Sequence, residues 1–282
     1  GALENDGASN DFGRPNRTNL HVHGLHVSPA ADDVYRAVEP GSEWRYTYAI
    51  PENHPAGTFY YHPHAHGGVS LQLAGGMAGA LVVRDPARSA LAAMADAVVL
   101  LQQCDFRPPP LSALLQPSTS LQSFLALSRS AGSLLAPNVL RAGRAPGASL
   151  RGLQHTIVNG RSAARLDGAA GAWLRLRVID AAPDMHYALY VDRGTAARCE
   201  ALAIASDGHY FASGRRLSLQ RPAVVPPGGR VDIAVRCAEG VAWLRSAGNP
   251  SVEWYGRVSA FEDAPLAAIR FSPPPAGVPA AP

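Results

Sequence analysis

Alternating apolar and polar positions along the chain predict short β-strands. Residues 43–50 read Glu-Trp-Arg-Tyr-Thr-Tyr-Ala-Ile, so that Trp44, Tyr46, Tyr48 and Ile50 fall on one face, which is the period of a half-buried strand. Other β-prone runs in the first third of the chain are 18–23, 58–64, 79–84 and 98–103. Turn sequences such as Glu39-Pro40-Gly41 separate these runs, and this spacing predicts a sandwich or barrel.

Two stretches depart from this pattern. Residues 86–95 begin with Pro and are rich in Ala, which predicts a short connecting helix. Residues 107–152 contain Pro108-Pro109-Pro110 and many Ser and Leu without a sustained strand period. A length of that order without β pattern indicates an insertion between domains, with a short helix expected near 121–127.

Strand patterns resume after the insertion. Leu174, Leu176 and Val178 alternate with two arginines, and the turn 225–229 precedes a final apolar run. The strands expected here are 155–158, 173–179, 187–191, 200–205 and 231–235. A chain of 282 residues can bury two cores. The predicted organisation is a first domain at 1–106, the insertion at 107–152, a second domain at 153–271 and a Pro/Ala-rich tail at 272–282.

Composition and charge exclude several classes of partner. All 25 positive side chains are Arg, and they are scattered among acidic residues, whereas phosphate binding requires a clustered patch. We therefore expect no nucleic-acid partner at a net charge of +3. No run reaches the roughly 20 apolar residues that span a bilayer, so we also expect no membrane span.

The three cysteines follow no metal-site spacing. Cys199 and Cys237 both flank strand-like runs, which predicts a disulfide between them if the protein is exported. A secreted, periplasmic or extracellular location is expected on this basis. Cys104 is interpreted as a buried apolar residue.

Histidines carry the strongest chemical signal. Of ten histidines, five fall in two groups, His21-Val22-His23 and His62-Pro63-His64-Ala65-His66. Residues two apart on a strand project to the same face, so each HxH pair points one way. Neutral imidazole is a common ligand of copper, zinc and iron. A single pair is more often structural, but two pairs on neighbouring strands can place four nitrogens around one metal site.

The sequences around both pairs resemble the first two copper motifs of multicopper oxidases, a family that includes laccases, bilirubin oxidases and bacterial copper-efflux oxidases. The matching segments are 18–25, 57–67, 39–41, 50–55 and 73–83, and 155–160, 174–180 and 226–232 resemble the family's middle cupredoxin domain. The resemblance implies an all-β fold of two tandem cupredoxin-like Greek-key sandwich or barrel domains. It also implies that the first domain is truncated at its N-terminus, since relatives have a strand or more before Asn19.

The resemblance further implies a role for each histidine. His21 would bind the type 2 copper of a trinuclear cluster, and His23, His62 and His64 the paired type 3 coppers, with His23 and His62 sharing one metal. His66 occupies a position in the HPHxHG variant that is usually not a ligand. The isolated histidines His155, His186 and His209 are expected to be structural.

Two family motifs are absent from the sequence. No HxxHxH or HCH segment is present, so the type 1 copper ligands and the other four ligands of the cluster are missing. The leading hypothesis is a fragment or short relative of a laccase-like multicopper oxidase, which couples one-electron oxidation of a small reducing substrate to reduction of dioxygen to water. By itself the chain would hold half of the trinuclear cluster and be inactive, and its partner would be a missing third cupredoxin domain.

Two alternatives remain open at this point. One is a copper-free cupredoxin scaffold that binds a protein partner and retains relic histidines. The other is a cupin-like single-metal enzyme, which the tandem motif contexts disfavour.

Overall fold

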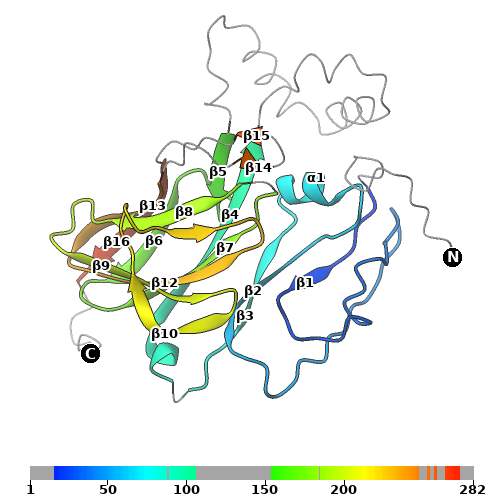
Figure 1. Ribbon diagram of the computed structural model, residues 1–282, viewed down its shortest axis with the longest axis horizontal. Coiled ribbons are helices and arrows are strands. Elements are labelled where there is room, and N and C mark those ends of the chain that lie inside the picture. The colour runs from blue at the N-terminus through cyan, green and yellow to red at the C-terminus, as the bar shows by residue number, and fades with distance from the viewer. Residues whose placement is uncertain are drawn as a thin grey trace, which may run out of the picture.

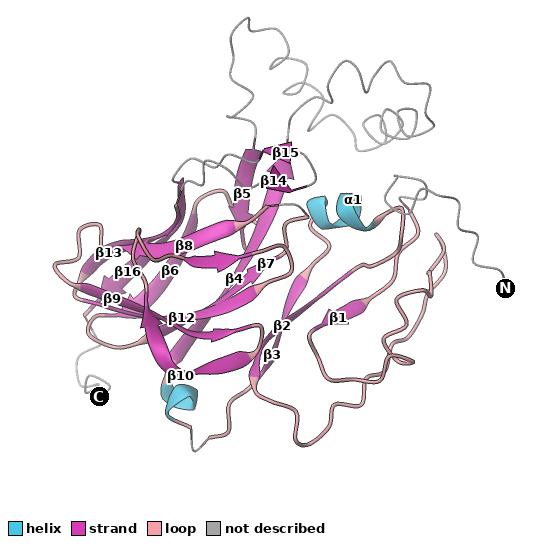
Figure 2. Cartoon of the chain, in the orientation of Figure 1, coloured by secondary structure: helices cyan, strands magenta, loops and turns pink. Residues whose placement is uncertain are grey.

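A computed structural model describes residues 16–87, 89–105, 154–183, 185–247, 253–254, 257–258 and 264–273. The predicted insertion, its short helix and nearly all of the predicted tail lie outside these residues. Within them the chain is almost entirely β, as predicted (Figure 2). No described helix is long and apolar enough to cross a bilayer.

A small antiparallel sheet lies at one end of the molecule (Figure 1). Its strands are β1 (His21–His23), β2 (Gly57–His62) and β3 (Gly79–Val83), with β2 in the centre. The short helix α1 (Val69–Ala74), which the sequence pattern does not predict, follows the second histidine group. Buried Val22 and Phe59 pack together under this sheet.

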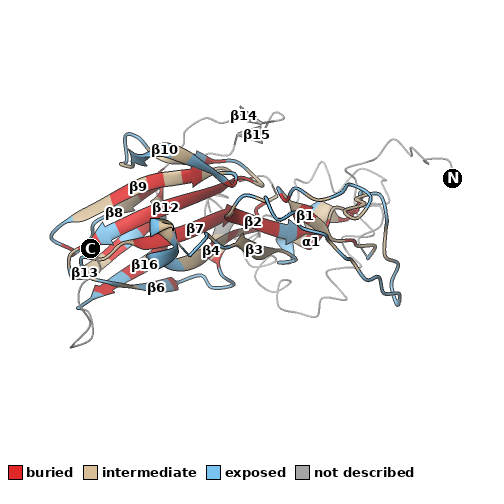
Figure 3. Ribbon diagram, turned by 90° about the horizontal axis from the view of Figure 1, so that it is seen from below, coloured by how far each residue is buried: buried red, intermediate tan, exposed pale blue. Residues whose placement is uncertain are grey.

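The larger body is a two-layer sandwich. One sheet has the order β10-β9-β12-β7-β4-β5 and the other β11-β8-β13-β16-β6. The strands are β4 (Ala95–Asp105), β5 (Gln154–Val158), β6 (Ala164–Ala169), β7 (Leu174–Asp180), β8 (Tyr187–Asp192), β9 (Cys199–Ser206), β10 (His209–Arg216), β11 (Ala223–Val225), β12 (Arg230–Cys237), β13 (Gly240–Ser246) and β16 (Ala264–Ser272), besides the separate pair β14 (Glu253–Trp254) and β15 (Arg257–Val258). Leu176 and Ile233 from one layer pack with Leu244 and Ile269 from the other in one core (Figure 3). Burial of this apolar surface stabilises the sandwich.

Three local expectations are corrected. Residues 43–50 form no strand within the described part of the chain, because alternation sets side-chain direction but a strand also needs a backbone partner. The helix expected at 86–95 is a single 3₁₀ turn, η1 (Ala90–Ala93), with Ser89 accepting the Leu91 N–H at 3.2 Å. The first strand, expected at 18–23, is confined to β1.

Strand β4 belongs to the sandwich, although the sequence assigned it to the first domain. It pairs in parallel with β7 and antiparallel with β5, and Val99 and Leu101 contribute to the sandwich core. Strand β4 therefore belongs to the larger sheet, although its residues precede the predicted domain boundary at residue 106. The remaining domain boundaries stay predictions.

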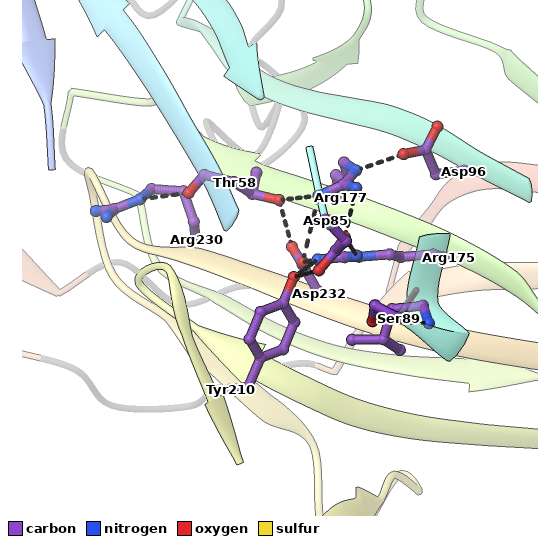
Figure 4. A network of polar contacts seen from close by, with 10 residues as sticks. Thr58, Asp85, Ser89, Asp96, Arg175, Arg177, Tyr210, Arg230 and Asp232 are labelled. Carbon is purple, nitrogen blue, oxygen red and sulfur yellow. Dashed lines mark hydrogen bonds and ion pairs between the residues drawn. The ribbon is translucent and has the colours of Figure 1, made fainter. Parts of the chain in front are cut away.

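Strand β7 is buried on both faces, not on one. In the sequence its arginines alternate with apolar residues, and in the structure Arg175 and Arg177 are both buried in an ion-pair network that reaches Thr58 of the small sheet. Arg175 Nη1 donates to Asp85 at 2.6 Å, and its Nε donates to Asp232 at 2.9 Å. Thr58 of β2 donates to Asp232 at 2.6 Å and accepts from Arg177 at 3.1 Å (Figure 4). Buried charges require such partners, so this network fixes the small sheet against the sandwich.

The predicted disulfide is confirmed. Cys199 on β9 and Cys237 on β12 lie directly opposite each other and are bonded, with a Cα–Cα distance of 4.1 Å. The side chain of Cys104 lies outside the described residues.

Candidate metal centre

Pairing of β1 with β2 brings the two histidine pairs together. His21 is directly opposite His62 in the antiparallel register, and His64 follows the end of β2. The ring centre of His62 lies 5.2 Å from that of His21 and 5.3 Å from that of His23, and His64 lies 5.2 Å from His21. One ligand nitrogen from each of His21, His23 and His62 lies within 4.8 Å of the others. Three of the four predicted residues therefore present nitrogens to one small volume, and the ring of His64 lies beside that of His21.

The His23 and His62 nitrogens have the spacing of two ligands on one metal. His23 Nδ1 lies 3.1 Å from His62 Nε2. Two nitrogens bound at about 2.0–2.1 Å with bond angles of about 90–110° lie about 3 Å apart. His62 Nδ1 donates to the Pro63 carbonyl at 2.8 Å, which leaves the Nε2 lone pair directed at His23.

Asp32 orients His21, a role that the sequence analysis missed. His21 Nδ1 lies 2.7 Å from Asp32 Oδ2, and Asp32 Oδ1 accepts the Val22 N–H at 3.0 Å. A carboxylate that holds one imidazole N–H fixes the tautomer and leaves Nε2 free for a metal. Asp32 lies in a loop without periodicity, so only the HxH motif nearby could have suggested it.

Asn19 positions His64. Asn19 Oδ1 accepts the His64 backbone N–H at 2.6 Å, and its Nδ2 donates to the Val34 carbonyl at 2.8 Å. The Nδ1 atom of His64 is buried and has no hydrogen-bond partner in the described part of the chain. Buried polar atoms are rarely left without a partner, and an imidazole nitrogen of this kind fits a metal ligand.

Burial favours the neutral form of three of these imidazoles. Burial, reinforced by the positive charge of Arg230, lowers the pKa of His23 to about 3. Burial lowers the pKa of His62 to about 4, although the hydrogen bond to Pro63 acts in the opposite direction. Burial also lowers the pKa of His64. Metal binding needs the neutral imidazole, so these residues present lone pairs at neutral pH.

An aromatic ring and a close turn pack against the site. Tyr60 stacks on His23 at 4.7 Å and on His62 at 4.9 Å between ring centres. The turn before β12 packs against the His23 ring, because a Cβ on Gly228 would lie 3.0 Å from His23 Cε1. Gly228 has φ +79°, so both the contact and the backbone conformation favour glycine. The sandwich therefore contributes to the site through this turn.

The other described histidines lie outside this group. His66 is exposed, with its ring 5.8 Å from His64 and 6.3 Å from Tyr35, and it lines a small pocket with Arg17. His26 and His54 form a separate pair, in which the His26 N–H donates to His54 Nε2 at 3.0 Å. His186 is partly buried outside the group, and His209 is exposed on β10. The side chain of His155 lies outside the described residues.

Comparisons with known proteins agree with this geometry. Residues 8–88 match the model of the multicopper oxidase family, and this range contains both histidine pairs. Solved structures with a similar fold include three bacterial enzymes. A multicopper oxidase from Pseudomonas thermotolerans is 22% identical with a TM-score of 0.58, and the match covers 93% of this chain and 52% of that chain. McoA variant 2F4 from Aquifex aeolicus is 19% identical with a TM-score of 0.65, and the match covers 95% of this chain and 53% of that chain. The laccase-like CueO from Ochrobactrum sp. is 19% identical with a TM-score of 0.61, and the match covers 93% of this chain and 50% of that chain.

Residues 8–88 are thus similar to a multicopper oxidase domain. The described chain as a whole has the cupredoxin-like fold of multicopper oxidases. It spans about half the length of the three structures above.

Proposed function

We propose that this chain is part of a laccase-like multicopper oxidase and supplies His21, His23, His62 and His64 to a trinuclear copper cluster. The observation that carries the proposal is the convergence of His21, His23 and His62 from two paired strands, with His64 just beyond the end of β2. An all-imidazole donor set suits copper, and the unpartnered Nδ1 of His64 fits a ligand position. The family match over residues 8–88 supports copper rather than another metal.

Each histidine has a separate role in this proposal. His21, held by Asp32, binds the type 2 copper. His23 and His62 share one type 3 copper, as their 3.1 Å nitrogen separation suggests, and His64 binds the other. Copper, when bound, supplies the electron transfer that couples oxidation of a small reducing substrate to reduction of dioxygen to water. Burial favours the neutral form of His23, His62 and His64. Asp32, Asn19 and Pro63 orient the site, and Tyr60 stacks on two of its rings.

The complete enzyme needs groups that this sequence does not contain. None of Cys104, Cys199 and Cys237 has a histidine beside it in the sequence, so the HCH motif of a type 1 copper is absent. We assign that centre and the remaining cluster ligands to a third cupredoxin domain. The small sheet of β1 to β3 would belong to the first domain, and the sandwich, which includes β4, would be the second. The disulfide supports an exported, secreted or periplasmic location.

Activity of the isolated chain tests this assignment. With copper added, the purified chain is expected to bind the metal weakly, show no intense blue thiolate absorption and leave a phenolic dye unoxidised. Copper titration with visible spectroscopy and an oxygen electrode measures all three. A blue band, or oxygen uptake that depends on the phenol, would contradict the proposed half-site. Absence of any copper binding would instead favour a scaffold with relic histidines.

Replacing Asp32 with Ala is expected to lower the copper affinity about 10- to 100-fold, because the His21 ring loses the carboxylate that fixes its tautomer. Asp33 provides a matched control, since this exposed neighbour caps the Tyr35 N–H and lies 3.8 Å from Arg36. Competition with a chromogenic chelator gives both affinities. Equal losses in D32A and D33A would argue against a specific role of Asp32.

A further inference from the structure

Arg230 connects the sandwich to both histidine-bearing strands. It begins β12, is only 5% exposed, and extends toward the small sheet (Figure 4). Its Nε lies 3.4 Å from the Thr58 carbonyl of β2, and its Nη1 donates to the Gly228 carbonyl at 3.0 Å. Its Nη2 lies so close to Gly24 that a Cβ at that position would clash with it.

These contacts adjoin His23 and reach the strand that carries His62. Gly24 directly follows His23, Thr58 lies on the strand that ends at His62, and Gly228 packs against the His23 ring. One guanidinium therefore touches the backbone of both strands and of the turn that covers the site. Sequence alone gives no sign of this, since Gly24 and Arg230 are far apart in the chain.

The charge of Arg230 is less compensated than that of Arg175, another buried arginine nearby. Its carboxylate partner is Asp207 at 3.2 Å, whose side chain is 52% exposed. Arg175, in contrast, pairs with Asp85 and Asp232, which are both almost fully buried. Accordingly, burial lowers the pKa of Arg230, whereas the pKa of Arg175 is raised by Asp232 despite its burial. The guanidinium of Arg230 is thus a weakly neutralised cation beside His23.

We propose that Arg230 is a positioning residue of the histidine site, where its guanidinium fixes His23 relative to β2 and its charge favours copper(I) over copper(II). The inference rests on the proposed copper function. The physical reason is that a fixed cation in a poorly solvated place repels the doubly charged ion more strongly than the singly charged ion. The hydrogen bonds to Gly228 and Thr58 keep this cation in place.

Relative affinities for the two copper ions separate the charge from the packing. In the full chain, copper(I) affinity is measured anaerobically with a bathocuproine competitor and copper(II) affinity with glycine as competitor. R230Q is expected to lower the copper(I) to copper(II) affinity ratio about tenfold. R230K keeps the charge and should stay within about threefold of the wild type. R270Q, which removes an exposed arginine paired with Asp167 in the other sheet, should leave the ratio unchanged.

Each outcome bears on a different part of the inference. A lower ratio in R230Q with R230K close to the wild type supports it. If R230Q weakens both ions equally, Arg230 acts through packing alone and the charge role is overturned. The same holds if R230K shifts the ratio as far as R230Q. If the wild-type chain binds neither ion, the proposed copper function fails and this inference fails with it. Thermal unfolding of each variant establishes that the proteins compared are folded.

Discussion

Replacing Asp232 with Asn is expected to lower the free energy of unfolding by about 3–5 kcal/mol, the usual cost of removing one partner from a buried ion pair. Asp232 is buried and accepts hydrogen bonds from Arg175 Nε at 2.9 Å and from Thr58 Oγ1 at 2.6 Å. The neutral amide leaves the buried positive charge of Arg175 with too little negative charge beside it. Urea denaturation under oxidising conditions, with the disulfide intact, measures the loss.

An exposed ion pair supplies the matched control. Asp167 pairs with Arg270 at 2.9 Å, and both side chains are more than two-thirds exposed. D167N makes the same chemical change and should alter stability by less than about 1 kcal/mol, because exposed pairs contribute little. Equal losses in D232N and D167N would show that the network between the small sheet and the sandwich does not hold them together.

Replacing His62 with Ala is expected to weaken copper binding by more than about 100-fold, because even the loss of an outer-shell partner costs 10- to 100-fold. His62 is at the centre of the group, with ring contacts to His21, His23 and His64. Its loss removes one nitrogen of the closest pair in the site. Chelator competition gives the affinity of the variant relative to the wild type.

His209 is the control for this experiment, since it is exposed on β10 and outside the group. H209A should bind copper like the wild type. H66A distinguishes the ligand set further, because His66 is assigned no metal. A loss in H66A as large as that in H62A would mean that the second motif uses a different pair of histidines.

The histidine pairs were predictable because strand period alone places residues two apart on one face. Their convergence was predicted from the two motifs, but the register that sets His21 opposite His62 across a long loop was not. The disulfide followed from cysteines at strand ends, which became neighbours when β9 and β12 paired. The histidine group and the disulfide each depend on a local sequence pattern and on the pairing of one pair of strands.

The supporting residues were less predictable for a physical reason. Asp32 and Gly228 lie in a loop and a turn, where no periodicity indicates which way a side chain or backbone faces. The alternation of arginines with apolar residues along β7 did not reveal that both faces are buried, because this pattern cannot distinguish solvent from a second buried layer. The covering layer comes from β2, more than a hundred residues earlier in the sequence, through contacts such as Thr58 to Arg177.

The central claim is that His21, His23, His62 and His64 form one copper centre. Imidazole ¹⁵N resonances, followed during an anaerobic copper(I) titration of the full chain, test it most directly because copper(I) is diamagnetic. The account predicts that the ring nitrogens of these four residues shift together while those of His26, His54, His66 and His209 do not. Shifts confined to the His26 and His54 pair, or spread evenly over all ten histidines, would contradict it.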